Sequence, residues 1–286
     1  MDKQEELAIV RRAYAKQVLA AAAVSDQRLE AAFSVVRRED FLGPGPWQIV
    51  RDGSYVQTPD DDPVYLYADD VVGILPERQI NNGQPSYHAD LIGHAIPKEG
   101  DHVVHVGAGV GYYSAVFAQL VGPRGRVTAI EFLPELAERA KANLRLLPNV
   151  EVLQGDGASV PFEAADVIYV NAGATRPAPS WLDRLTTGGR LILPLTSSKG
   201  FSNAFDKITS GVVFRIERRG DEYLARWAAG VAIFPCAGSR DEESELALAT
   251  ALRNGGERKV TRLYRHEHIP AERCWLRAPG WCLAYS

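Results

Sequence analysis

The chain has few cysteines, no long apolar run and no surplus of positive charge. Its 286 residues contain three cysteines, Cys236, Cys274 and Cys282, and this odd number late in the chain predicts no disulfide framework. No apolar stretch approaches the ~20 residues that span a bilayer, so we expect no membrane partner. A net charge of −4 argues against general nucleic-acid binding.

The remaining composition is that of an ordinary globular protein. With 46% hydrophobic and 24% charged residues, the chain can bury a full core. The N-terminus is acidic and lacks the charged-then-apolar order of a secretion signal. Together with the sparse cysteines, this predicts a cytoplasmic protein. The oligomeric state is not predictable from these features.

Residues 103–112 read Val-Val-His-Val-Gly-Ala-Gly-Val-Gly-Tyr, an apolar run that stops at three alternating glycines. This pattern is typical of a buried strand that turns sharply into a helix and lets a ligand touch the backbone. A dinucleotide fingerprint needs a small residue three places after its second glycine, where this chain has the large Tyr112. The spacing is instead that of S-adenosylmethionine (SAM) methyltransferases. A nucleotide or nicotinamide site and a glycine turn without a ligand are the alternatives. The predicted SAM-binding residues of this turn are Gly107, Ala108, Gly109, Gly111 and Tyr112.

The order of the expected elements predicts an α/β fold with a Rossmann-like, doubly wound and mostly parallel sheet. From residue 101 onwards apolar strands alternate with amphipathic helices, which gives βαβ units with helices on both faces of the sheet. Two β-rich runs, at 212–218 and 223–234, predict an antiparallel hairpin with a Gly-Asp turn. The expected strands are at 102–106, 126–131, 150–153, 166–170 and 190–194, and the expected helices at 111–121, 134–147 and after Pro179.

Further segments flank this core on both sides. Two amphipathic helices and a loop-like stretch at 47–76 precede it, whereas a helix at 239–253 and short strands around Cys274 and Trp281 follow it. We therefore expect an N-terminal helical cap at 1–98, a core at 99–236 and a small β-rich extension at 237–286. His266, His268, Cys274 and Cys282 in this extension match no zinc spacing. We expect half-buried strand residues there, and no metal.

Polar side chains stand where three of the expected strands end, which is where ligands bind in such sheets. Glu131 lies about twenty residues past the glycines, where a carboxylate can accept hydrogen bonds from two ribose hydroxyls. Asp156, flanked by Gly157, can accept a bond from the exocyclic amine of adenine. Asn171 lies among small residues, where its amide can position the methionine part of SAM or a substrate. Plain turn or strand-end chemistry is the alternative for each.

These segments together resemble the protein-L-isoaspartate O-methyltransferase family. The likeness runs from about residue 7 to 196 and continues more weakly to 235. It implies methyl transfer from SAM to the α-carboxylate of L-isoaspartyl residues in damaged proteins. An ionised carboxylate needs no general base, so such chemistry depends mainly on proximity and orientation. The matching segments are 37–42, 80–85, 104–113, 155–157, 166–174 and 188–194.

One departure from the family concerns the loop at 81–85, which reads Asn-Asn-Gly-Gln-Pro. The resemblance implies a serine that contacts the substrate carboxylate, and Gly83 stands in its place. The backbone N–H of Gly83 or the amides of Asn82 and Gln84 can replace that contact, so we expect these three residues at the acceptor site. His88, in the next helical turn, either faces the site or is structural.

The loss of that serine leaves the acceptor open. One hydrogen bond to a charged group contributes about 1.5–3 kcal/mol, so its loss is enough to lower activity tenfold or more. The first hypothesis is O-methylation of an isoaspartyl peptide or protein. A methyltransferase of the same lineage that acts on another peptide or small carboxylate is the second, and a SAM-binding protein with little catalysis is the third.

Overall fold

The structure is a computed structural model that describes residues 2–199, 209–266 and 269–285. Its strands are β1 (Gln48–Arg51), β2 (Ser54–Gln57), β3 (Gly73–Leu75), β4 (Ile80–Asn81), β5 (His102–Val106), β6 (Arg126–Glu131), β7 (Val150–Gln154), β8 (Ala165–Val170), β9 (Leu185–Ser197), β10 (Thr209–Arg219), β11 (Glu222–Ile233), β12 (Arg262–Arg265), β13 (Cys274–Ala278) and β14 (Trp281–Ala284). Its helices are α1 (Lys3–Ala21), α2 (Gln27–Val35), α3 (Glu39–Leu42), α4 (Pro85–Ala95), α5 (Tyr112–Val121), α6 (Pro134–Leu144), α7 (Pro179–Asp183) and α8 (Glu242–Asn254). Short 3-10 helices lie at Pro63–Leu66, Pro76–Arg78, Glu257–Lys259 and Ala271–Arg273.

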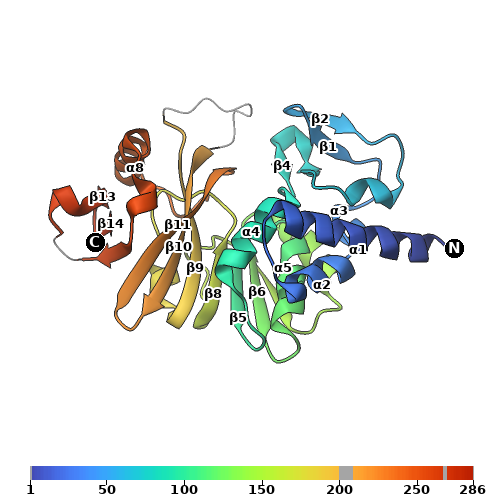
Figure 1. Ribbon diagram of the computed structural model, residues 1–286, viewed down its shortest axis with the longest axis horizontal. Coiled ribbons are helices and arrows are strands. Elements are labelled where there is room, and N and C mark those ends of the chain that lie inside the picture. Colours follow the sequence, from blue (N-terminus) through green and yellow to red (C-terminus); the bar gives the residue numbers. More distant parts are fainter. Residues whose placement is uncertain (1, 200–208, 267–268, 286) are drawn as a thin grey trace.

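A ten-stranded sheet in the order β13-β14-β12-β11-β10-β9-β8-β5-β6-β7 forms the centre of the molecule (Figure 1). The strands from β9 to β7 are parallel, and every residue of β5 is buried, as expected for a strand covered on both faces. The β10–β11 hairpin and the C-terminal strands continue this sheet with antiparallel pairing. The predicted Rossmann-like core with an antiparallel hairpin and a β-rich extension is therefore confirmed.

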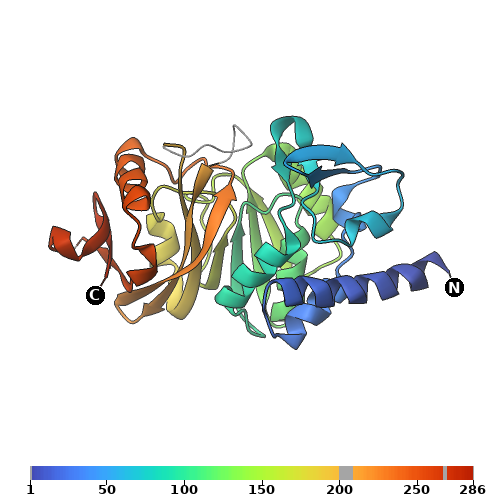
Figure 2. The same cartoon turned by 45° about the horizontal axis from the view of Figure 1, so that its top comes forward.

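Two buried clusters cover the two faces of the sheet. Side chains alternate between faces along a strand, and accordingly Val103 belongs to one cluster whereas its neighbour Val104 belongs to the other. The first cluster contains residues of α1, α2, α4, α5 and α6, and the second contains residues of α7, α8 and the C-terminal strands. The N-terminal and C-terminal segments also lie towards opposite ends of the sheet (Figures 1 and 2).

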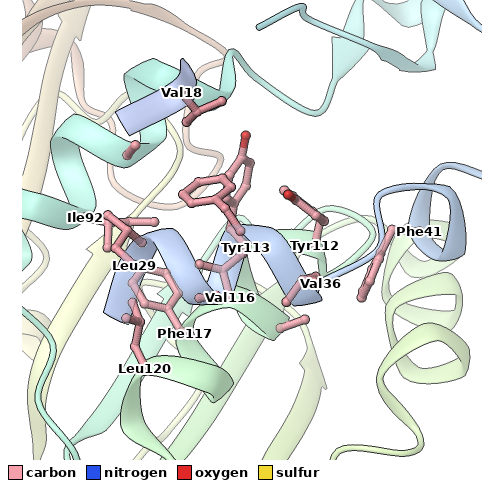
Figure 3. Close-up of a cluster of buried hydrophobic side chains, with 14 of the residues drawn as sticks. Val18, Leu29, Val36, Phe41, Ile92, Tyr112, Tyr113, Val116, Phe117 and Leu120 are labelled. Carbon is pink, nitrogen blue, oxygen red and sulfur yellow. The ribbon is translucent and has the colours of Figure 1, made fainter. Parts of the chain in front are cut away.

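The N-terminal cap packs on the sheet through the aromatic start of α5. Tyr112 contacts Phe41 edge-on, with ring centroids 5.7 Å apart, and lies 6.5 Å from Phe33 of α2. Leu29 and Ile92 approach the same helix from α2 and α4 (Figure 3). This packing places the β4–α4 loop beside the glycine turn of the core.

The prediction of a loop-like stretch at 47–76 is wrong in part, because β1 and β2 form an antiparallel hairpin there. Its turn residues, Asp52 and Gly53, have φ values of 49° and 76°. An Asp-Gly pair with positive φ at both positions is the turn that matches the twist of a two-residue hairpin. The sequence carried this signal, but the neighbouring prolines and aspartates obscured it.

Within the described ranges, none of the helices has the length and apolar character needed to cross a bilayer.

Candidate active site

A cavity of about 1330 Å³ opens where the parallel strands end. Its floor includes the residues that follow β5, β6, β7 and β8, in agreement with the rule that open α/β sheets bind ligands at their carboxyl edge. Residues of the β4–α4 loop, of β11 and of the segment from Pro235 to Arg240 also line the cavity. The predicted cofactor turn and the predicted acceptor loop therefore share one cavity.

The glycine turn requires glycine for two separate reasons. Gly107, Gly109 and Gly111 have φ values of 77°, 57° and 92°, which side-chain-bearing residues rarely adopt. A Cβ on Gly107 would also lie 2.8 Å from the backbone oxygen of Asn171. Gly107, Ala108 and Gly109 line the cavity. Their close packing leaves the backbone as the surface that a ligand meets.

Glu131 connects the end of β6 to this turn. One oxygen of its carboxylate accepts a hydrogen bond from Gly109 N–H at 2.7 Å, and the other accepts one from Leu133 N–H at 2.9 Å. The side chain is 6% exposed, and burial raises the pKa of Glu131 despite these backbone hydrogen bonds. Each oxygen retains a second acceptor position. Glu131 can therefore hold the turn and still bind hydroxyl groups in the cavity.

Asp156 stands at the end of β7 and also lines the cavity. It accepts hydrogen bonds from Ala158 N–H at 2.9 Å and from the Ser159 hydroxyl at 3.0 Å. A Cβ on Gly238 would lie 1.8 Å from a carboxylate oxygen of Asp156, so the backbone near Gly238 runs directly against this side chain. The sequence did not predict this contact, because no local pattern links residues so far apart.

Two of the three predicted donors of the acceptor loop already donate hydrogen bonds to other residues of the protein. Gly83 N–H donates to Asn81 Oδ1 at 2.9 Å, and Gln84 Nε2 donates to Asp69 Oδ2 at 2.9 Å. Asn82 is 7% exposed, and its Nδ2 is buried without a hydrogen-bond partner among the described residues. All three predicted acceptor residues nevertheless line the cavity.

The two adjacent tyrosines at the start of α5 face different surroundings. Tyr112, which we predicted to bind the cofactor, is absent from the cavity lining, and its side chain packs against the cap, where it is 1% exposed. Gly111, also predicted to bind the cofactor, is absent from the lining as well, so the structure does not bring these two residues to the cavity surface. Tyr113 lines the cavity instead. The sequence could not distinguish the two, because both are apolar-aromatic and neighbours in the chain.

His88 and Tyr169 form a buried pair beside the acceptor loop. Nδ1 of His88 lies 2.8 Å from the Tyr169 hydroxyl, and the His88 ring stacks on Tyr113 with centroids 3.7 Å apart. Burial lowers the pKa of His88 to about 3, with smaller contributions from His105 and Arg38. His88 is therefore neutral at physiological pH and lines the cavity as a polar but uncharged group.

The remaining sequence predictions concern Asn171 and the tail. Asn171 lines the cavity, and its amide lies 3.4 Å from Gly107 O.

In the tail, Sγ of Cys274 and Sγ of Cys282 lie 2.7 Å apart, whereas His268 lies outside the described residues. Among the residues that the structure describes, no group of three His, Cys, Asp or Glu side chains is placed to hold a metal ion.

The chain resembles one enzyme family over most of its length. The model of the family "Protein-L-isoaspartate(D-aspartate) O-methyltransferase (PCMT)" matches residues 15–220. The protein-L-isoaspartate O-methyltransferase of Pyrobaculum neutrophilum is 30% identical over 74% of this chain and 91% of its own length. The enzyme of the same name from Ignicoccus hospitalis is 37% identical over 53% of this chain and 69% of its own length. The match to protein-L-isoaspartate O-methyltransferase 2 of Archaeoglobus fulgidus, at 42% identity, spans 55% of that relative.

Solved structures show the same likeness. A protein-L-isoaspartate O-methyltransferase superimposes with a TM-score of 0.64 and 25% identity, over 89% of this chain and 73% of the other. A putative Plasmodium falciparum protein-L-isoaspartate O-methyltransferase in complex with S-adenosyl-L-homocysteine has a TM-score of 0.60. At 16% identity, over 79% of this chain and 97% of the other, the latter supports the fold alone.

Proposed function

The chain belongs to the protein-L-isoaspartate(D-aspartate) O-methyltransferase family of SAM-dependent enzymes, and we propose that its methyl acceptor is the α-carboxylate of L-isoaspartyl residues in peptides and proteins. The observation that carries this proposal is the single cavity that joins the glycine turn, Glu131 and Asp156 to the acceptor loop. Because a methyl transferase must bring its two substrates together in one space, this arrangement suits direct transfer. The biological role would be the repair of damaged proteins.

The residues at the strand ends fit the polar groups of SAM. SAM carries a ribose with two hydroxyl donors and an adenine with an exocyclic amine, and the cavity offers the carboxylates of Glu131 and Asp156 as acceptors. At Gly107 and Gly109 the turn supplies a surface without Cβ atoms, where a ligand can approach the backbone. When bound, SAM supplies a methyl group on a positively charged sulfur.

We assign the predicted roles as follows, as proposals. Glu131 binds the ribose hydroxyls, Asp156 binds the adenine amine, and Asn171 positions the amino-acid end of the cofactor. The loop residues Asn82, Gly83 and Gln84 shape the acceptor side. The backbone of the glycine turn and of Gly157 completes the cofactor side, through Gly107, Ala108, Gly109, Gly111 and Tyr112.

Methyl transfer to a carboxylate does not require the chain to remove a proton from the acceptor. A carboxylate acceptor is already ionised at neutral pH, so its oxygen can attack without a general base. The described lining is compatible with this chemistry, since burial lowers the pKa of His88 to about 3 and makes it a weak base, and both oxygens of Glu131 accept backbone hydrogen bonds. The chain's contribution is therefore to orient the carboxylate and to exclude water.

The direct test is transfer of labelled methyl groups from SAM to an isoaspartyl peptide and to its aspartyl twin. We expect labelling of the isoaspartyl peptide at a much higher kcat/KM than of the twin, together with alkali-labile product, as a methyl ester requires. Equal labelling of both peptides, or labelling of neither while other acceptors are methylated, would favour another acceptor of the same lineage. SAM binding in calorimetry without any turnover would favour a binding protein.

A further inference from the structure

His88 lines the cavity and is held there by contacts with two aromatic side chains. It lies on α4, is 3% exposed, stacks on Tyr113 and meets the Tyr169 hydroxyl through Nδ1. Its other nitrogen, Nε2, has no hydrogen-bond partner among the described residues, although the residue lines the cavity. A ring nitrogen without a partner, on a residue that lines a cavity, is suited to meet a ligand.

The contact with Tyr169 determines which nitrogen carries the proton. The Tyr169 hydroxyl is fully buried, and His88 is its only hydrogen-bond partner in the described part of the chain. If Nδ1 carried the proton, the Tyr169 O–H would be left without an acceptor, which buried groups avoid. Tyr169 therefore donates to Nδ1, and the single proton of the neutral imidazole resides on Nε2.

The position of Nε2 coincides with the side-chain position of residue 83. A Cβ on Gly83 would lie 2.3 Å from His88 Nε2, well inside contact distance, and Gly83 has a φ of 69°. The imidazole thus occupies the space in which a side chain at residue 83 would begin. Two other donors of the loop are already engaged, since Gly83 N–H donates to Asn81 and the Gln84 amide donates to Asp69. The Nδ2 of Asn82 has no partner among the described residues, but it is buried.

We propose that His88 is an acceptor-binding residue, whose Nε2–H donates a hydrogen bond to the acceptor carboxylate from the place where a side chain at residue 83 would stand. The inference rests on the proposed function, because it names the donor that holds the proposed acceptor. Gly83 and His88 then form a matched pair: glycine leaves the space, and histidine fills it with a neutral donor.

Two conservative variants of His88 separate this role from a structural one. His88→Asn keeps a polar group near the position of Nδ1 for Tyr169 but lacks the reach of Nε2, whereas His88→Gln carries an amide N–H to about the position of Nε2. We expect His88→Asn to raise the KM for the isoaspartyl peptide by about tenfold to a hundredfold, the range for one hydrogen bond to a charged group. His88→Gln should recover much of this loss, and both should bind SAM with wild-type affinity.

A second pair of variants tests the match with Gly83. Gly83→Ser alone should lose peptide binding, because its side chain meets Nε2 and its φ is unfavourable. Gly83→Ser combined with His88→Ala makes room for the serine hydroxyl and should bind the peptide better than either single variant. Thermal unfolding of each variant controls for loss of fold.

The protonated nitrogen can also be identified without activity. Nitrogen NMR of histidine-labelled wild-type protein should show His88 with its proton on Nε2, and a proton on Nδ1 would overturn the inference. A wild-type KM in His88→Asn, or equal losses in the Asn and Gln variants, would overturn it as well while leaving the proposed function intact. A wild-type enzyme that labels no isoaspartyl peptide would overturn the proposed function, and this inference with it.

Discussion

At the level of single residues, the two carboxylates that we propose bind the cofactor each have a partner in the protein before a ligand arrives. Glu131 accepts backbone hydrogen bonds from Gly109 and Leu133, and Asp156 accepts bonds from Ala158 and Ser159. These bonds orient the oxygens in advance, so a ligand does not have to order them on binding. Preorganisation of this kind predicts a large effect when either carboxylate is removed.

We expect Glu131→Ala and Asp156→Ala each to raise the dissociation constant of SAM at least about tenfold. A hydrogen bond to a charged group contributes about 1.5–3 kcal/mol, and tenfold in affinity corresponds to about 1.4 kcal/mol. Glu131→Ala should show the larger effect, because it also leaves the Gly109 N–H of the turn without its acceptor. Isothermal titration calorimetry measures both values.

Matched variants control for changes that merely disturb the neighbourhood. Ser159→Ala removes the hydroxyl that donates to Asp156 but leaves the Asp156 carboxylate in place. Glu135→Gln changes an exposed acid of α6 that pairs with Arg78. Both should bind SAM within a few fold of the wild type. Near-wild-type affinity in both alanine variants would contradict the assignment of the cofactor side.

At the scale of elements, the C-terminal strands are part of the central sheet and have their own core contacts. β12 pairs with β11, and β14 and β13 follow it at the sheet edge. Trp275 of β13 is 6% exposed, its ring lies 5.4 Å from that of Phe214 on β10, and its indole N–H donates to Gly255 O at 3.1 Å. The extension therefore stabilises the hairpin that forms one wall of the cavity.

We expect Trp275→Ala to lower the free energy of unfolding by about 3–5 kcal/mol, the usual cost of a large-to-small change in a core. Trp275 does not line the cavity, so SAM affinity of the folded variant should stay near that of the wild type. Urea unfolding followed by tryptophan fluorescence and circular dichroism gives the free energy. Leu246→Ala, at a 50% exposed position of α8, is the control and should change it by less than about 0.5 kcal/mol. A loss of SAM binding in stable Trp275→Ala protein would contradict this division of roles.

At the scale of the whole molecule, two deeply buried histidines couple stability to pH. Burial lowers the pKa of His105 and of His88 to about 3, with His105 and Arg38 contributing to the latter. An unfolded histidine has a pKa of about 6.5, so the unfolded chain binds more protons between these two values. The stability contributed by each neutral ring is fully present above about pH 6.5 and is lost as the pH falls towards 3.

We expect the free energy of unfolding to decrease by up to about 1.4 kcal/mol per pH unit for each of these histidines as the pH is lowered from about 7 to 5. His105→Asn, which can retain the contact with the Ser114 hydroxyl, should reduce that slope by one histidine's share. Urea titrations of both proteins at several pH values measure the two slopes. Identical slopes would show that His105 is not buried in its neutral form. The raised pKa of Glu131 makes the free energy of unfolding change with pH in the opposite direction. Both proteins contain Glu131, so its contribution cancels when the two slopes are compared.

The sequence predicted those features that depend on neighbours in the chain. The glycine turn, Glu131 and Asp156 were found because strand ends and glycine spacings are local signals, and the structure places all three in one cavity. The β1–β2 hairpin was missed although Asp52-Gly53 signalled it. The division into cap, core and extension at residues 98 and 236 stays a prediction.

Other features of the site depend on contacts between distant segments. Tyr112 faces the cap whereas Tyr113 faces the cavity, because the packing of α2 on α5 selects between two equivalent neighbours. Gly238 reaches Asp156 because Phe234 and Cys236 hydrogen-bond to Gly173 beside the end of β8. Neither contact leaves a periodic pattern in the chain.

By itself, the sequence determined the α/β class, the cofactor turn and the absence of a serine at residue 83, since these follow from residue types and short spacings. The tertiary structure alone shows that the ring of His88 occupies the space into which a side chain at residue 83 would extend. His88 is five residues from Gly83 in the chain, but its orientation comes from Tyr169 on β8 and Tyr113 on α5. Hydrogen bonding and stacking with these distant side chains hold the His88 ring beside Gly83, and no local pattern encodes that orientation.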